Sequence, residues 1–225
     1  MTRLKTLTIQ FDTQLVENEI QRFRGAIIKL LPQKEVLFHN HINDGYRYAY
    51  PLIQYKRLNN KAALFCIGEG VENIVLFFAS NNFNVRIGNK RHCLQIEEVN
   101  SKLVDIACDT EQIYSYQLTN WLPLNEENYS QFTQTSDTEE QLIMLQRILT
   151  GNILSMLKGL GIRVEQRVEV HIKHLEERPN VIFKGVKLYC ANISFDSNVL
   201  LPQHVGLGKH ASVGFGILTV TTINK

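Results

Sequence analysis

The chain has 225 residues, 44% of them hydrophobic and 20% charged, which is the composition of an ordinary folded protein of one or two domains and excludes a disordered or fibrous chain. The formal net charge is only +2, so a nucleic acid would have to be bound by a local basic patch and not by the charge of the whole molecule. The longest apolar run, residues 74–79, is far too short to span a bilayer and no secretory signal is visible, so we expect a cytoplasmic protein.

The cysteines are scattered along the chain and form no C-x-x-C pair. They are Cys66, Cys93, Cys108 and Cys190. This spacing is not that of a zinc site or of a disulfide framework, so we expect four buried, reduced thiols and neither a metal nor another cofactor.

The first part of the chain reads as a strand followed by a helix. Apolar residues alternate with polar ones over 4–11, which predicts a strand with one apolar face. Apolar residues then recur at helical spacing over 20–31, and Pro32 ends that helix. Asp12 or Thr13 is the expected N-terminal cap.

Two β-rich runs, 50–58 and 61–68, flank Asn59-Asn60 and predict a hairpin. A short helix over 68–79 should follow it. Further strands are expected over 83–87, 92–99 and 102–108. The order β-α-β-β-α-β, with one additional strand, is typical of a ferredoxin-like domain.

The second half of the chain repeats this pattern. We expect a strand over 112–122, a polar loop over 125–137, an amphipathic helix over 138–160, a hairpin of strands 167–174 and 181–195 that turns at Pro179-Asn180, and a last strand over 217–222. The prediction is therefore an α+β fold of two tandem ferredoxin-like domains, residues 1–110 and 111–225.

A glycine-rich loop, residues 206–216, stands where the second helix of the repeat is expected. Glycine has no Cβ and tolerates positive φ, so a ligand can approach backbone N–H groups closely. The loop is not a Walker motif, because Gly208-Lys209 runs into His210, and no βαβ unit follows it as a dinucleotide site requires. The alternative is a tight loop without a ligand.

His39 and His41 share a face if their segment is extended, with Cα atoms roughly 6–7 Å apart. At neutral pH one imidazole can accept a proton while the other donates one, which is the chemistry of RNA cleavage by internal attack. Two alternatives remain. The pair could belong to a metal site, although Asn43 and Asp44 break the His-x-His-x-Asp-His pattern, or it could lie on a half-exposed strand without a role.

The Gly-x-Gly-(x)-Gly-Phe-Gly pattern before the last strand is similar to the hallmark of the repeat-associated RNA-binding superfamily of CRISPR systems. His-Asn-His, then Tyr-Ala-Tyr-Pro-Leu-Ile-Gln-Tyr-Lys over 48–56, then Gly-Asn-Ile-Leu-Ser-Met over 151–156 precede that loop in order. Over nearly its whole length the chain resembles the CRISPR repeat-RNA processing endoribonucleases, in the branch with a histidine pair near the N-terminus.

This resemblance implies metal-independent cleavage of precursor CRISPR RNA within each repeat, which leaves a 2′,3′-cyclic phosphate and a 5′-OH. The repeat RNA is then the main partner, and effector-complex subunits and a second copy of the chain are further ones; no membrane is involved. The alternative from another class is a non-catalytic RNA-binding subunit of an effector complex, which shares the fold and the loop but has no need of the histidine pair.

The resemblance assigns the catalytic roles to His39, His41, Tyr48 and Lys29. Tyr50 is the alternative to the tyrosine and Lys34 the alternative to the lysine. RNA contacts are expected from the loop and from the second domain, at Gly206, Gly208, Lys209, Gly214, Gly216, Arg163 and Arg167. Other cations available for RNA are Lys173, His210, the cluster of Arg86, Lys90 and Arg91, and the cluster of Lys56, Arg57 and Lys61, each cluster alone being more typical of a solvated face.

Overall fold

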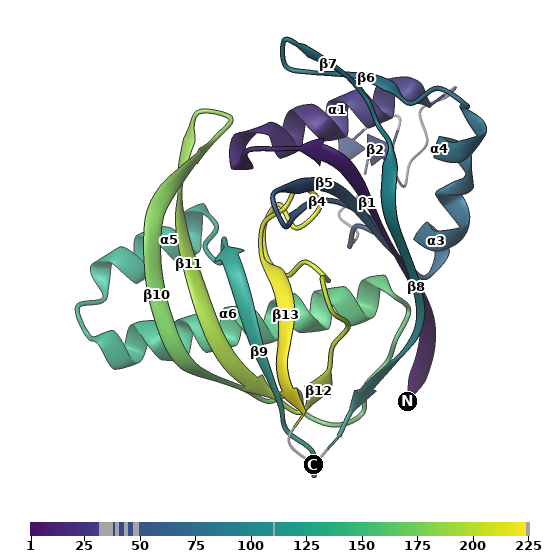
Figure 1. Ribbon diagram of the computed structural model, residues 1–225. Helices are drawn as coiled ribbons and strands as arrows, with labels where there is room; N and C mark the ends of the chain where they lie inside the picture. The colour runs from purple at the N-terminus through teal and green to yellow at the C-terminus, as the bar shows by residue number, and fades with distance from the viewer. Residues whose placement is uncertain (32–37, 39–40, 43–44, 47–49, 110, 224–225) are drawn as a thin grey trace. The chain divides into compact units, whose positions relative to one another are not determined.

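The computed structural model describes residues 1–31, 38, 41–42, 45–46, 50–109 and 111–223 (Figure 1). The chain divides into two compact units. The N-terminal unit consists of Arg3–Val104 and Ser212–Gly214, and the C-terminal unit of Met1–Thr2, Asp105–Ala211 and Phe215–Lys225. The boundary between the two units therefore lies between Val104 and Asp105, a few residues before the boundary predicted at 110. Three residues of the glycine-rich loop, Ser212–Gly214, belong to the N-terminal unit.

The N-terminal unit is built on a sheet with helices on one face. Four strands follow the order β8-β1-β5-β4, as in a ferredoxin-like fold. They are β1 (Thr2–Gln14), β4 (Ile53–Leu58), β5 (Lys61–Ile67) and β8 (Ile96–Cys108). Phe11 of β1 meets Phe23 and Phe77 edge to face, with ring centroids 6.1 Å apart in both pairs. Since Phe23 lies in α1 (Ile20–Leu30) and Phe77 in α4 (Val75–Ala79), the core lies between the sheet and these helices.

The predicted caps of the first helix are wrong. Strand β1 runs on through Asp12, whose carboxylate accepts a hydrogen bond from the backbone N–H of Gln95 at 3.2 Å and whose own N–H donates to the Gln95 carbonyl at 3.0 Å. The sheet therefore uses Asp12. A single 3-10 turn, η1 (Glu17–Glu19), starts the helix instead, and Glu19 accepts from the N–H of Val16 at 3.0 Å.

The middle of the unit contains two tight hairpins. Asn59 and Asn60 have φ of 49° and 64°, as a type I′ turn requires, so the predicted hairpin of β4 and β5 is confirmed. The other hairpin joins β6 (Asn84–Ile87) to β7 (Lys90–Cys93). Strand β8 is continuous where two strands were predicted, and the predicted helix over 68–79 is two short ones, α3 (Glu69–Asn73) and α4, which meet at the buried Ile74.

The C-terminal unit is a second ferredoxin-like sheet, with strand order β10-β11-β9-β13 (Figure 1). Its strands are β9 (Tyr114–Trp121), β10 (Val170–Phe183), β11 (Val186–Ser197) and β13 (Ile217–Ile223). The short β12 (Val199–Leu200) pairs with the end of β8. The long helix α6 (Thr138–Gly159) confirms the helical spacing of the sequence, since Leu145, Leu149, Ile153 and Met156 are all buried.

Two expectations for this unit are wrong. The predicted polar loop contains helix α5 (Glu126–Gln134), because the side chain of Asn125 caps it by accepting from the Asn128 N–H at 2.7 Å and Phe132 gives it a buried anchor. The β10–β11 hairpin turns at Lys184-Gly185, with φ of 50° and 82°. Pro179-Asn180 lies inside β10 at a register shift, where a residue without an N–H is tolerated.

All four cysteines are free, but they are not all buried as predicted. Cys66 and Cys190 are buried, Cys108 is half-buried and Cys93 is exposed, because Cys93 occupies the outward face of β7. No helix in the described part of the chain is both long and apolar enough to cross a membrane.

Candidate active site and RNA-binding surfaces

The backbone around the histidine pair includes a small ribbon of two strands. β2 (His41–Ile42) pairs with β3 (Gly45–Tyr46), and His41 stands opposite Tyr46. His39, Tyr48 and Lys34 lie outside the described residues. Among the predicted catalytic residues, the structure describes the side chain of Lys29. This side chain is exposed in the last turn of α1.

Gln54 holds the segment that leads into β4. Its side-chain amide donates to the Tyr50 hydroxyl at 2.8 Å and to the Pro51 carbonyl at 2.9 Å, and the side chain is fully buried. Tyr50, the alternative active-site tyrosine, is thereby fixed in the segment before this strand. The sequence singled out Gln54 only as part of the motif over 48–56 and did not indicate this role, which depends on the fold of the segment before it.

Lys56 lies on the same face of β4 as Gln54, because side chains alternate along a strand. Its side chain is fully buried, and that burial lowers its pKa to about 7. A lysine in this setting changes its protonation near neutral pH, which an exposed lysine does not. The sequence pattern singled out Lys56 only as part of a motif and did not indicate its burial.

The predicted basic cluster around Lys56 is wrong as a solvent-facing surface. Lys56 is buried, and the other two members of the cluster, Arg57 and Lys61, already have hydrogen-bond partners. Arg57 donates from Nε to the Leu15 carbonyl at 2.7 Å, and Lys61 donates to the Glu97 carboxylate at 2.7 Å. Both side chains are held by partners within the unit, so they do not form an open patch for RNA.

The outer edge of β4 is covered by the glycine-rich loop. The N–H of Tyr55 donates to the Ser212 carbonyl at 2.8 Å, and Tyr55 forms a parallel bridge with Val213. On its buried side the Tyr55 ring meets Phe23 edge to face, with centroids 5.9 Å apart. Residues 212–214 thus complete the N-terminal sheet, which leaves the β4 edge paired at this point.

The glycines of the loop are required by packing inside the protein. Gly208, Gly214 and Gly216 have φ of 90°, 87° and 58°, in the left-handed region that favours glycine. A Cβ on Gly208 would lie 2.8 Å from the Trp121 ring, and one on Gly214 would lie 2.5 Å from Ile20 Cδ1. A Cβ on Gly216 would collide with the Leu207 carbonyl.

Several N–H groups of this loop are already paired. Those of Leu207, Lys209 and Gly216 donate to backbone carbonyls of the same unit at 2.8, 3.1 and 3.0 Å. These three groups are therefore not bare donors for a ligand, contrary to the simplest interpretation of the glycine pattern. Lys209, which is half-buried, remains the positively charged residue of the loop.

His210 is not a cation at neutral pH. Its ring stacks on Phe183, with centroids 3.8 Å apart, and Phe215 lies edge-on to Phe183 at 6.0 Å. Burial, with smaller effects from the charges of Lys209 and Lys184, lowers the His210 pKa to about 4. The neutral ring therefore joins the loop to the end of β10 by stacking.

The remaining RNA-binding candidates differ in exposure. Arg163 and Arg167 are exposed between α6 and β10, and Arg167 lines a pocket of about 720 Å³ together with Arg147 of α6. Lys173 is held by Asp196 in an ion pair of 2.7 Å. No cluster of three or more His, Cys, Asp or Glu side chains suited to a metal ion occurs among the residues that the structure describes.

Comparison with known proteins covers nearly the whole chain. The models of the Cas6b N-terminal and C-terminal domains match residues 2–105 and 108–221. A crystal structure of Cas6b superimposes with a TM-score of 0.89 at 28% identity, over 98% of this chain and 100% of that one. A crystal structure of the CRISPR RNA processing endoribonuclease Cas6b superimposes with a TM-score of 0.75 at 25% identity, again over 98% and 100%.

A curated relative matches in sequence over a shorter stretch. An uncharacterised protein of Methanocaldococcus jannaschii is 35% identical over 96 residues, which are 43% of this chain and 64% of that protein. The match thus spans less than two thirds of the relative.

Proposed function

The chain belongs to the Cas6b family, and from that premise we propose that it is an endoribonuclease that cuts precursor CRISPR RNA within the repeats, without a metal ion or another cofactor. The observation that carries this proposal is the match of both Cas6b domain models to a chain that has His-Asn-His at 39–41. A merely structural RNA-binding subunit would have no need of that pair.

The proposed chemistry is internal attack. One histidine of the pair His39 and His41 takes the proton of the 2′-OH, and the 2′-oxygen then forms a bond to the adjacent phosphorus. The bond from phosphorus to the 5′-oxygen breaks, and the second histidine protonates that leaving oxygen. The products are a 2′,3′-cyclic phosphate and a 5′-OH.

Lys29 and Tyr48 are proposed to assist this step. The exposed ammonium of Lys29 would stabilise the negative charge that accumulates on the pentacoordinate phosphorus in the transition state. Tyr48 would position the ribose or the phosphate, and Tyr50 is the alternative. Lys34 is the alternative lysine.

The RNA would be held by shape and by backbone contacts. We assign those contacts to the exposed Arg163 and Arg167 and to the loop at Gly206, Gly208, Lys209, Gly214 and Gly216. Because three N–H groups of the loop are paired and His210 is neutral, the contribution of the loop rests on its shape and on Lys209. Effector-complex subunits, a second copy of the chain and a cytoplasmic location belong to the same proposal.

The experiment is cleavage of repeat RNA by the purified protein in excess EDTA, with analysis of the product ends. We expect full activity and a cyclic phosphate, because a histidine pair needs no metal. A substrate with a 2′-deoxy nucleotide just upstream of the cut should bind normally and stay intact, since it lacks the nucleophile. Loss of activity in EDTA with recovery in Zn²⁺ or Mn²⁺, or normal cleavage of the deoxy substrate, would contradict this mechanism.

A further inference from the structure

We propose that the β6–β7 hairpin of the N-terminal unit binds the phosphodiester backbone of the RNA, at phosphates other than the one that is cut. The proposal rests on the proposed function for the identity of the ligand as RNA. The location of the binding site is argued from the strand register of the hairpin and from its positively charged side chains. We call the side chains of Arg22, Arg86, Lys90 and Arg91 the hairpin cations.

The register of the hairpin places two arginines directly opposite each other. Arg86 of β6 pairs with Arg91 of β7, and Asn84 pairs with Cys93. Val85 and Ile87 are buried, so the alternate residues Asn84 and Arg86 face outward, and their partners face outward with them. Like charges opposite each other on one face of a hairpin destabilise it, and an anion bound between them would remove that cost.

Two more cations lie at the turn of the same hairpin. Lys90 follows the Gly88-Asn89 turn and is exposed. The guanidinium of Arg22, from α1, lies over Gly88, where a Cβ would stand 3.3 Å from its Nη1. Gly88 has φ of 59°, as the first position of a II′ turn requires, and the absence of a Cβ there lets the Arg22 guanidinium lie this close.

Nothing in the described part of the chain neutralises this group. No carboxylate forms an ion pair there with any hairpin cation, although Arg57, Lys61, Lys173 and Arg178 all have acidic partners. The sequence has no Asp or Glu between Glu72 and Glu97. A chain with a net charge of only +2 thus keeps one local surface basic, as binding of a polyanion requires.

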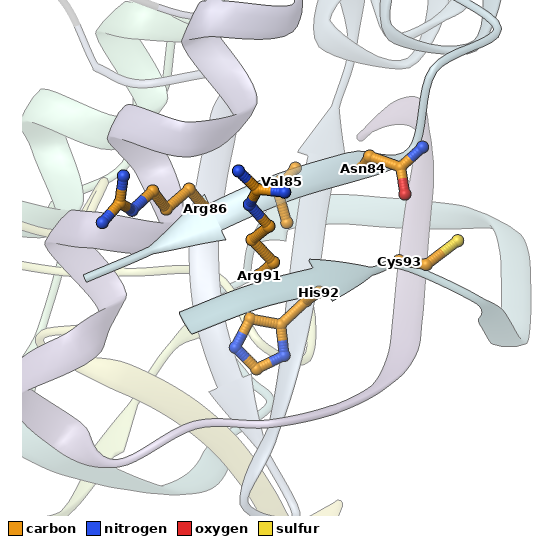
Figure 2. A pocket seen from close by; sticks show the side chains of 6 residues that line it. All are labelled: Asn84, Val85, Arg86, Arg91, His92 and Cys93. Atoms are coloured by element: carbon orange, nitrogen blue, oxygen red, sulfur yellow. The ribbon is translucent and has the colours of Figure 1, made fainter. Parts of the chain in front are cut away.

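The hairpin is also hollowed. A pocket of about 390 Å³ is lined by Asn84, Val85, Arg86, Arg91, His92 and Cys93. Figure 2 shows these six side chains along the two strands, with Arg86 from one strand and Arg91 and His92 from the other. Guanidinium groups bind phosphate with two parallel hydrogen bonds, and Asn84 adds a neutral donor, so the chemistry fits a phosphodiester chain.

The first test compares the salt dependence of RNA binding between variants. The probes are a repeat RNA from the CRISPR array of the source genome, made uncleavable by a 2′-deoxy nucleotide, and an oligouridylate. For Arg86→Gln/Arg91→Gln we expect weaker binding of both, and a slope of log K against log salt that is smaller by about 0.7 for each phosphate that the protein no longer neutralises. The double variant Lys5→Gln/Lys102→Gln removes two exposed charges elsewhere on the same unit and should leave the slope nearly unchanged.

Folding is checked by Arg91→Glu. This variant places a carboxylate opposite Arg86, so it should raise or preserve the melting temperature while it weakens RNA binding most. A loss of affinity without a loss of stability cannot come from misfolding. The single-turnover cleavage rate at saturating protein should stay at the parental value in the control variant Lys5→Gln/Lys102→Gln.

Cys93 supplies a second readout, because it is an exposed thiol on the outward face of the hairpin. Saturating repeat RNA should slow its modification by a maleimide, measured by mass spectrometry, at least several-fold more than it slows modification of Cys108. An unchanged salt slope in Arg86→Gln/Arg91→Gln, or an equal rate of Cys93 modification with and without RNA, would overturn the inference. If the parental protein binds RNA through the hairpin but does not cut it, the proposed activity fails and the inference stands.

Discussion

Burial lowers the pKa of some basic side chains that a count of residues treats alike. Lys56 is fully buried with a pKa of about 7, and His210 is stacked on Phe183 with a pKa of about 4. In contrast, Arg86 and Arg91 lie opposite each other on the outward face of the β6–β7 hairpin. At the scale of the residue, the basic surface is therefore decided by exposure and by partners.

Lys56 should make stability depend on pH above neutrality. Its pKa is about 7 in the folded protein against an ordinary value of 10.5, so between these values the unfolded chain binds more protons. The contribution of Lys56 to the free energy of unfolding therefore rises from pH 7 to pH 10.5 and is least favourable below pH 7. Lys56→Met should raise the free energy of unfolding near pH 6, by a few kcal/mol at about 1.4 kcal/mol for each unit of pKa shift, and the gain should vanish towards pH 10.5.

The measurement is urea denaturation of Lys56→Met and the parent across that pH range. Lys102→Met, at an exposed lysine, is the control and should show no such pH-dependent difference. A stability difference for Lys56→Met that does not change with pH would show that the lysine is charged throughout in the folded protein.

The histidine pair can be tested separately from binding. His39→Ala and His41→Ala each remove a proton carrier, so each should lower the single-turnover cleavage rate by about 10²–10⁴-fold. Affinity for uncleaved repeat RNA should change little, because an imidazole is not needed to hold the backbone. The exposed His174 gives a matched control, His174→Ala, which should cut at the parental rate. Parental rates in both histidine variants would favour the non-catalytic RNA-binding subunit.

At the scale of the element, the glycine-rich loop is shaped by contacts within each unit. Gly208 packs against Trp121, whose indole N–H donates to the Asn152 side chain at 3.0 Å, and Gly214 packs against Ile20 of α1. Asn152 of the motif at 151–156 and the distant Gly208 thus contact the same Trp121 side chain.

Gly214→Ala should destabilise the protein more than Gly161→Ala. Both glycines have positive φ, 87° and 71°, so both substitutions strain the backbone by about 1–2 kcal/mol. A Cβ at Gly161 meets nothing within 4 Å, whereas one at Gly214 meets Ile20 Cδ1 at 2.5 Å. The additional loss of stability caused by a steric clash should therefore appear only for Gly214→Ala.

Ile20→Val removes that methyl group and tests the steric part directly. In the Ile20→Val background, the loss of stability caused by Gly214→Ala should approach that of Gly161→Ala, as measured by urea denaturation in a double-mutant cycle. Equal losses for the two glycine variants in the parental background would mean that the contact with Ile20 relaxes without cost.

At the scale of the whole molecule, the N-terminal unit is not continuous in sequence. Residues 212–214 belong to it, and Ser212 accepts the hydrogen bond of the Tyr55 N–H on the outer side of β4. A fragment that ends at Val104 would leave this edge of the sheet unpaired, and an unpaired edge favours aggregation. The C-terminal segment is therefore part of the folding unit of the N-terminal half.

Hydrogen exchange should report this pairing. In the full chain the amide of Tyr55 should exchange slowly, because it is buried and donates to Ser212 at 2.8 Å. In a fragment of residues 1–104 it should exchange much faster than the amide of Leu64, which lies in the paired interior of β5. Fusion of residues 211–215 to the fragment through a flexible linker should restore protection. Equal protection of Tyr55 in the fragment and in the full chain would contradict the assignment.

The sequence by itself determined the features that local patterns encode. Helical spacing predicted α6, the Asn59-Asn60 pair predicted the β4–β5 hairpin, and the order of elements predicted two ferredoxin-like domains. These predictions succeeded because periodicity and turn chemistry depend on residues close together in the chain. The turn of the β10–β11 hairpin was misplaced because Pro179-Asn180 fits a bulge in a strand as well as a turn.

Only the tertiary structure decided which of these residues are buried and what faces them. The burial of Lys56 and the packing of Gly214 against Ile20 depend on segments that are distant in the chain. The pairing of Arg86 with Arg91, in contrast, follows from the two-residue Gly88-Asn89 turn, which fixes the register of its hairpin locally. Burial is set by the whole folded chain, and no local pattern of residue types encodes it.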